Sequence, residues 1–139
     1  MKTKLFALGF AFLLAISLFS TSSNVATASE VSTNEYLNET VTFKETVDTP
    51  VFTHDEKKGN LQLDTYATYL EDKADFDYFV VTLYEAGSDV TMGNKVALYT
   101  NDLDIAAWDV PSGKYYFRFE KPRNGLKLKV KYSVYPYNG

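Results

Sequence analysis

Three lysines, Lys127, Lys129 and Lys131, occupy alternate positions in the sequence GLKLKVKYSVYPY at residues 125–137. Apolar residues fill the positions between them, and this period of two is typical of a β-strand with one face in water. Side chains at alternate positions of a strand stand about 7 Å apart. A row of cations at that spacing suits a repeating polyanion, because each contact with an anionic group releases counterions into the solvent.

Two interpretations of this lysine row are open. The lysines could bind an anionic polymer, glycan or lipid surface. They could instead protect an edge strand, since lysines on an exposed edge discourage pairing with another chain. From Pro111 onward the sequence has seven basic residues and one acidic residue, although the whole chain carries a net charge of −4. This overall acidity argues against nucleic acid as the partner.

The preceding segment KYYFRFE, residues 114–120, also alternates, with Phe117 and Phe119 on its apolar side. We expect this segment and the lysine strand to form a hairpin across the turn PRNG. Both registers that this turn permits place Phe117 and Phe119 beside the apolar side of the lysine strand. Both also bring Tyr116 and Arg118 to the lysine face, where Tyr116 could stack on a ligand. The predicted ligand-binding residues are therefore Tyr116, Arg118, Lys127, Lys129 and Lys131.

Acidic residues in two loops form a second candidate site. Asp72, Asp75 and Asp77 lie within six residues, and Asp102 and Asp104 lie in a later polar corner. Oxygen ligands grouped in loops suit calcium, although the spacing is not that of an EF-hand. The alternative is that these carboxylates fix turns by accepting backbone N–H groups. The sequence requires no cofactor, and calcium is the metal that it suggests.

Signals for an enzyme are few. The single histidine, His54, lies at the start of the charged segment HDEKKGN, which favours a solvated surface position. None of the serines considered as its partner, Ser88, Ser112 and Ser133, has a Gly-x-Ser-x-Gly setting. The absence of cysteine excludes thiol chemistry. We therefore predict a protein that is not an enzyme, while hydrolysis by a carboxylate pair stays open on composition alone.

The amino-terminal sequence predicts secretion. Lys2 and Lys4 precede an apolar run at residues 5–19, and small residues end the segment at Ala28. This is the pattern of a signal peptide, and the run is too short for a transmembrane helix. We expect a signal peptide at residues 1–28, a flexible lead-in at 29–39, and one domain at 40–139. Without disulfides, packing of the many tyrosines and phenylalanines must stabilise that domain.

The rest of the sequence predicts seven to eight short strands separated by turns and no helix, which indicates an all-β antiparallel sandwich or jelly-roll. In residues 61–70 one face should carry Leu61, Leu63, Thr65, Ala67 and Tyr69. The run FDYFVVTLYEAG suits a buried central strand. Residues 89–92 and 95–100 should form a hairpin at Gly93-Asn94. Trp108 lies in the apolar run IAAWDV, which favours a buried position over a sugar-stacking one.

Three segments carry a resemblance to a known family: ADFDYFVVTLYEAGSDVTM, VPSGKYYFRFE and LKVKYSVYPY. Together they resemble the bacterial pre-peptidase C-terminal domain over roughly residues 73–137. The resemblance implies a secreted jelly-roll sandwich of the kind usually appended to proteases. Some members of that family bind calcium, collagen or polysaccharide.

The function predicted from the sequence is that of a secreted, bacterial-type binding module. Its ligand would be an extracellular surface, a polyanionic polymer or glycan, or a protein. The alternative is a secreted inhibitor or antimicrobial factor that acts on a protein or a membrane. Salt separates the two, because binding to a polyanion weakens steeply with salt and a one-to-one protein complex weakens less.

Overall fold

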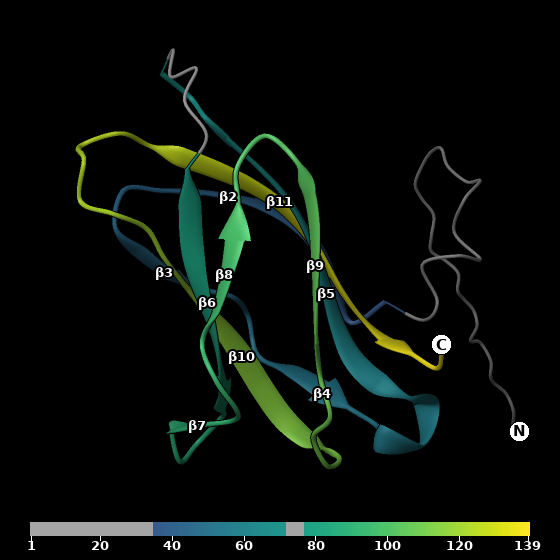
Figure 1. Cartoon of the computed structure of the whole chain (residues 1–139). Coiled ribbons are helices and arrows are strands. Elements are labelled where there is room, and N and C mark those ends of the chain that lie inside the picture. Colours follow the sequence, from purple (N-terminus) through teal and green to yellow (C-terminus); the bar gives the residue numbers. More distant parts are fainter. Residues whose placement is uncertain (1–34, 72–76) are drawn as a thin grey trace, which may run out of the picture. The chain divides into compact units, whose positions relative to one another are not determined.

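A computed structural model describes residues 35–71 and 77–139 of the chain (Figure 1). The predicted signal peptide and residues 29–34 of the predicted lead-in lie outside these ranges. The described part contains strands and one short 3-10 helix, η2 (Glu56–Lys58). No helix in that part of the chain is long and apolar enough to cross a membrane.

One of the two sheets has four strands and contains the lysine segment. Its order is β2-β11-β5-β9, and every neighbouring pair is antiparallel. The strands are β2 (Leu37–Phe43), β5 (Asn60–Tyr69), β9 (Leu103–Trp108) and β11 (Leu128–Tyr137). The lysine strand β11 therefore lies inside the sheet, between β2 and β5.

The other sheet has six strands arranged around β10 and β6, which pair with each other. β3 and β4 pair with the far side of β10, whereas β7 and β8 pair with the far side of β6. The strands are β3 (Thr46–Asp48), β4 (Phe52–His54), β6 (Tyr78–Glu85), β7 (Val90–Thr91), β8 (Val96–Tyr99) and β10 (Gly113–Glu120). The prediction that the run around β6 forms a central strand is confirmed.

The two sheets pack as a sandwich, which confirms the predicted fold class, although the described residues form ten strands instead of the predicted seven to eight. Alternate residues of β5, β10 and β11 are buried, as the period-two patterns predict. Phe119 of β10 joins the two layers, since its ring centroid lies 5.3 Å from that of Tyr132 in β11 and 5.8 Å from that of Phe79 in β6. Trp108 is buried as predicted, with its ring 5.0 Å from that of Phe117.

The predicted hairpin between the last two strands is wrong. β10 belongs to the six-stranded sheet and β11 to the four-stranded sheet, so the connecting segment crosses from one layer to the other. Lys121 anchors this crossover, because its buried ammonium donates hydrogen bonds to Lys44 O, Pro122 O and Asn124 Oδ1 at 3.1, 2.6 and 2.6 Å. A buried cation with all three donors used is a stable anchor. The inward position of Phe117 and Phe119 was predicted correctly, but they meet β11 across the core.

The predicted hairpin at Gly93-Asn94 is also wrong, although both of its strands exist. β7 and β8 pair with β6 rather than with each other. β8 pairs with Tyr78 to Val81 of β6, and β7 pairs with Tyr84 and Glu85 of β6. The two short strands therefore lie along the same edge of β6. A single long strand thus pairs with both.

β2 begins at Leu37, inside the segment 29–39 that we expected to be a lead-in. Tyr36, just before it, stacks on Phe52 with ring centroids 5.7 Å apart. Its hydroxyl also lies 3.1 Å from His54 Nδ1. This aromatic anchor ties the start of β2 to β4 of the other sheet, which explains why the strand starts earlier than its alternation alone indicates.

Candidate functional site

Lys129 and Lys131 stand on the outer face of the four-stranded sheet, on its second strand. Lys129 lies between Thr42 of β2 and Thr68 of β5, and Lys131 lies between Thr40 and Tyr66. Both lysines are exposed, so their predicted outward alternation is confirmed. Because β11 has hydrogen-bonded partners on both sides, the interpretation that these lysines protect an edge strand is wrong.

Lys129 and Lys131 have no ion-pair partner among the residues that the structure describes. Within residues 35–71 and 77–139 the ion pairs are Arg118–Asp48 and Arg123–Glu45, and neither involves a lysine. The cross-strand neighbours of Lys129 and Lys131 are hydroxyl side chains. Lys127 lies just before β11, where its backbone N–H donates to Glu71 Oε1 at 2.9 Å and its side chain is exposed. Lys129 and Lys131 are therefore available to an external anion. Lys127 also interacts with Glu71, because its backbone N–H and then its charge lower the pKa of that carboxyl.

Tyr116 and Arg118 lie on the other side of the sandwich, on the outer face of the six-stranded sheet. Arg118 forms a two-point pair with Asp48, with Nε–Oδ1 and Nη2–Oδ2 distances of 2.7 and 3.0 Å. Its guanidinium also lies 5.0 Å from the ring centroid of Tyr84. The hydrogen bond to Asp48 raises the pKa of Arg118 further above its usual range. The structure therefore divides the predicted binding residues between two opposite faces.

Tyr116 also interacts with neighbouring side chains on this face. Its ring stacks on that of Tyr84 at 5.3 Å with an interplanar angle of 11°, and its hydroxyl donates to Asp89 Oδ1 at 2.8 Å. Burial, followed by this hydrogen bond, raises the pKa of Tyr116. Tyr116 and Arg118 are thus both engaged by neighbouring side chains on this face.

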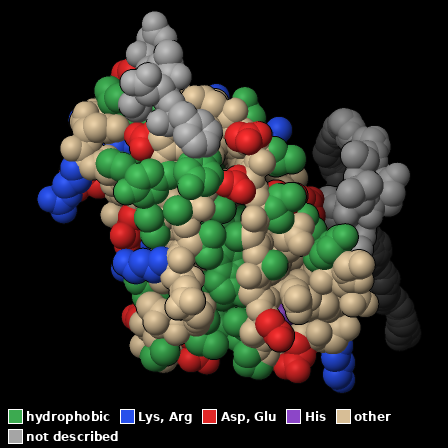
Figure 2. Space-filling model, viewed as in Figure 1, with side chains coloured by type: hydrophobic (Ala, Val, Ile, Leu, Met, Phe, Trp, Pro, Cys, Tyr) green, Lys and Arg blue, Asp and Glu red, His purple; other side chains and the backbone are tan. Residues whose placement is uncertain are grey.

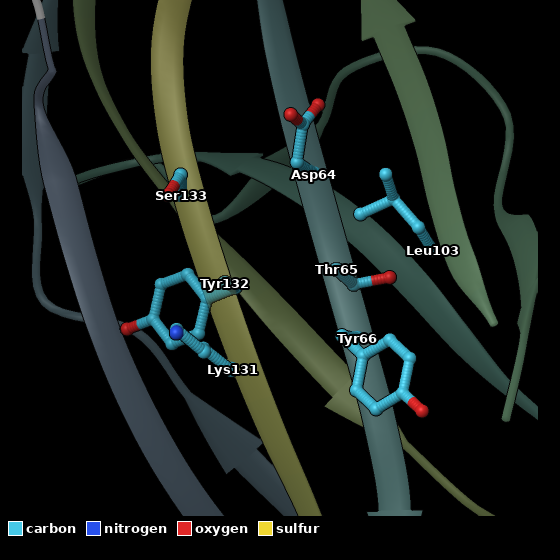
Figure 3. Close-up of a pocket in the computed structure, with 7 residues that line it drawn as sticks. All are labelled: Asp64, Thr65, Tyr66, Leu103, Lys131, Tyr132 and Ser133. Atoms are coloured by element: carbon cyan, nitrogen blue, oxygen red, sulfur yellow. The ribbon is translucent and has the colours of Figure 1, made fainter. Parts of the chain in front are cut away.

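A groove of about 370 Å³ lies on the lysine face, over β11, β5 and the edge strand β9 (Figure 3). Lys131 and Ser133 come from β11, Asp64 and Tyr66 from β5, and Leu103 from β9. Thr65 and Tyr132, which are buried, complete the lining. The groove therefore combines a cation, a carboxylate, hydroxyl groups and apolar side chains, which is a mixture suited to binding a polar ligand.

The carboxylate of Asp64 is held in place by two side chains beside the groove. The Tyr135 hydroxyl lies 2.9 Å from each oxygen of Asp64, and Gln62 Nε2 lies 3.3 Å from Oδ1. Gln62 also contacts the Tyr135 hydroxyl. Burial, followed by the hydrogen bond to Asp64, raises the pKa of Tyr135 to about 12. Asp64 is thus a preorganised hydrogen-bond acceptor.

Sequence reasoning did not assign Asp64, Tyr66 or Leu103 to a site, and it considered Ser133 only as a partner of His54. The alternation of residues 61–70 does place Asp64 and Tyr66 opposite the apolar side, and that side is buried as predicted. The pairing of β5 with β11 could not be predicted from the sequence. This pairing sets Tyr66 beside Lys131 and Asp64 beside Ser133. The outward polar residues of β5 were the available signal.

Three of the five predicted calcium ligands, Asp77, Asp102 and Asp104, lie in the described part of the chain. Asp72 and Asp75 lie outside the described residues, and the described part holds no group of three or more acidic, histidine or cysteine side chains that could bind a metal. Asp77 accepts from Tyr78 N at 2.8 Å and from the Tyr69 hydroxyl at 2.7 Å. Asp102 and Asp104 accept from the backbone N–H groups of residues 99, 103 and 105. These three carboxylates fix turns, as the alternative interpretation proposed.

The expectation that His54 is solvated is wrong, since it is 1% exposed at the end of β4. The Tyr36 hydroxyl accepts from Asp55 N and also forms a hydrogen bond with Nδ1 of His54, each at 3.1 Å. His54 Nε2 has no hydrogen-bond partner among the described residues. Burial lowers the pKa of His54, and the nearby carboxylates of Asp55 and Glu56 oppose this shift. The signal for burial was its position two residues after Phe52, on the same side of the strand.

No protein-family model, curated protein or solved structure matches this chain. The resemblance to the pre-peptidase C-terminal domain thus rests on the three sequence segments alone. The proposal that follows is drawn from the chemistry of the lysine face.

Proposed function

We propose that this protein is a secreted, non-enzymatic module that binds an anionic polymer along the outer face of its four-stranded sheet. The observation that carries the proposal is the pair Lys129 and Lys131, exposed on an internal strand and without ion-pair partners in the described residues. Lysines at an edge have a protective role, whereas an internal strand needs no such protection. Their charge is free for a ligand.

The mode of binding follows from the spacing of the lysines. Lys129 and Lys131 stand about 7 Å apart along β11, and Lys127 extends the row beyond the start of the strand. A polymer with regularly spaced anionic groups can contact two or three of these cations at once. The hydroxyls of Thr40, Thr42 and Thr68 flank the row and can donate hydrogen bonds to the same anionic groups.

The test is a salt series of binding to alginate and to bacterial cell walls. Because each lysine contact releases about one counterion, the slope of log K against log salt should be on the order of −2 for the wild type. The variant Lys129→Gln/Lys131→Gln should bind weakly and lose most of this slope. The matched control is Lys95→Gln/Lys114→Gln, which removes the same charge from exposed positions elsewhere. Equal binding by both variants would contradict the proposal.

An inhibitor that docks on a protein is the second candidate, and one observation favours it. The edge strand β9 exposes Leu103 and Ile105, which are 61% and 52% exposed. Figure 2 shows hydrophobic side chains down the middle of the view, where Figure 1 places β8 and β9. Such a complex would form one-to-one and depend weakly on salt, so the salt series separates the two functions.

A further inference from the structure

The groove changes character across the sheet, from cationic to apolar. Lys131, Tyr66 and Leu103 form one continuous cross-strand row over β11, β5 and β9. Two strand spacings, about 10 Å, separate the lysine from the leucine. Tyr66 is 47% exposed and Leu103 is 61% exposed, so both offer apolar surface to a ligand. A ligand that fills this row needs an anionic group at one end and an apolar surface at the other.

The neighbouring row adds hydrogen-bonding groups with the opposite charge. Ser133 pairs with Asp64, and Asp64 pairs with Ile105 at the edge. Because Tyr135 and Gln62 hold its carboxylate, Asp64 presents a fixed negative charge one row from Lys131. A chain with closely spaced charges and no hydroxyl groups, such as polyphosphate, would be repelled by this carboxylate and could donate no hydrogen bond to it. A ligand rich in hydroxyl groups would instead donate hydrogen bonds to it.

These two rows of side chains discriminate between kinds of anionic polymer. The following inference rests on the function proposed above. We propose that the groove binds an acidic polysaccharide, in which charged groups are attached to hydroxyl-bearing rings. The anionic group of one residue pairs with Lys131, its ring packs on Tyr66 against Leu103, and its hydroxyls bind Asp64 and Ser133. The groove volume, about 370 Å³, is at the lower end of the usual range for ligand sites, so it accommodates a short segment of the polymer.

The experiment compares three polymers by calorimetry: alginate as the acidic polysaccharide, polyphosphate as the densely charged chain, and dextran as the neutral polysaccharide. Wild type should prefer alginate. Tyr66→Ala should weaken alginate binding by about three- to tenfold, because it removes the stacking surface. Tyr66→Phe should bind like the wild type, since it keeps the ring, and it guards against a general loss of structure. Lys131→Gln should weaken alginate binding as well.

Each outcome separates the ligand class from the proposed function. If polyphosphate binds at least as tightly as alginate and Tyr66→Ala changes neither, the polysaccharide inference falls while the anionic-polymer function stands. If dextran binds as tightly as alginate, the requirement for an acidic sugar is wrong. If neither anionic polymer binds the wild type, the proposed function itself is overturned. Preferential alginate binding that is lost in Tyr66→Ala and kept in Tyr66→Phe supports the inference.

Discussion

The two outer faces of the sandwich use their cations in different ways. On the six-stranded sheet, Arg118 pairs with Asp48 through two hydrogen bonds and packs on Tyr84. On the four-stranded sheet, Lys129 and Lys131 have neutral hydroxyl and tyrosine neighbours across the strands. Both sets of cations were expected on one face. Because these cations lie on opposite faces, Arg118 stabilises its own sheet and the lysines are available to an external ligand.

The different roles of Arg118 and the two lysines also follow from the chemistry of arginine and lysine side chains. A guanidinium has a planar array of donors that matches a carboxylate, so a fixed pair with Asp48 is favourable. A lysine ammonium is a compact, strongly hydrated charge on a flexible chain, and it gains little from pairing at the surface. Substitutions on the two faces should therefore have different consequences for stability and binding.

The largest effect should come from the core that both faces share. Phe119 is fully buried between Phe79 and Tyr132 of opposite sheets. Phe119→Ala should lower the free energy of unfolding by about 3–5 kcal/mol, because it leaves a cavity between the layers. Chemical denaturation measures this change, and Phe119→Leu should cost clearly less. If Phe119→Ala unfolded with wild-type stability, the two sheets would not depend on this contact.

A smaller loss should follow from breaking the pair on the six-stranded face. Arg118→Ala should lower the free energy of unfolding by about 1 kcal/mol, since it removes a partly exposed ion pair and a contact with Tyr84. A double-mutant cycle with Asp48→Ala measures the coupling of the two side chains. Polymer binding should be unchanged in all three variants. A large loss of binding would place Arg118 in the ligand site and remove the contrast between the faces.

Lowering the pH should destabilise the contact between Tyr36 and His54, which joins the two sheets. His54 is hydrogen-bonded to the Tyr36 hydroxyl, and burial keeps its folded-state pKa below the ordinary 6.5. The unfolded chain therefore binds the proton more readily, so this stability is present above about pH 6.5 and is lost as pH falls through the folded-state pKa. Denaturation at a series of pH values should show a step in this range that His54→Gln removes. An unchanged step in that variant would assign it to other groups.

The smallest effect on stability should come from the lysine face. Lys129→Gln/Lys131→Gln should change the free energy of unfolding by less than about 0.5 kcal/mol, because neither side chain has an ion-pair partner in the described residues. Thermal and chemical denaturation test this expectation. A loss comparable to that of Arg118→Ala would mean that the lysines help to hold the sheet, and the contrast between the two faces would fail.

Predictions about single strands succeeded more often than predictions about strand pairs. The buried sides of β5, β10 and β11 follow directly from their alternation. The pairing of β10 with β11 was wrong for an instructive reason. A hairpin and a crossover between layers both bring the apolar sides of two consecutive strands together, so alternation fits either arrangement. What separates them is the long-range pairing of β10 with β6 and of β11 with β5.

The candidate site was predicted in part for the same reason. Lys129 and Lys131 were placed correctly because their outward position is a local property of one strand. Tyr66, Asp64 and Leu103 come from two other strands, and their approach to Lys131 depends on the order β11-β5-β9. No local pattern in the sequence encodes that order.

By itself the sequence determined the fold class, the apolar side of most strands and the outward position of the lysines, because each depends on side chains two residues apart. The tertiary structure decided which strands pair, that the lysine strand is internal, and that Arg118 lies on the opposite face. These features depend on contacts between residues far apart in the chain, such as Phe119 with Tyr132 and Tyr66 with Lys131. These contacts form only when both layers pack around one core.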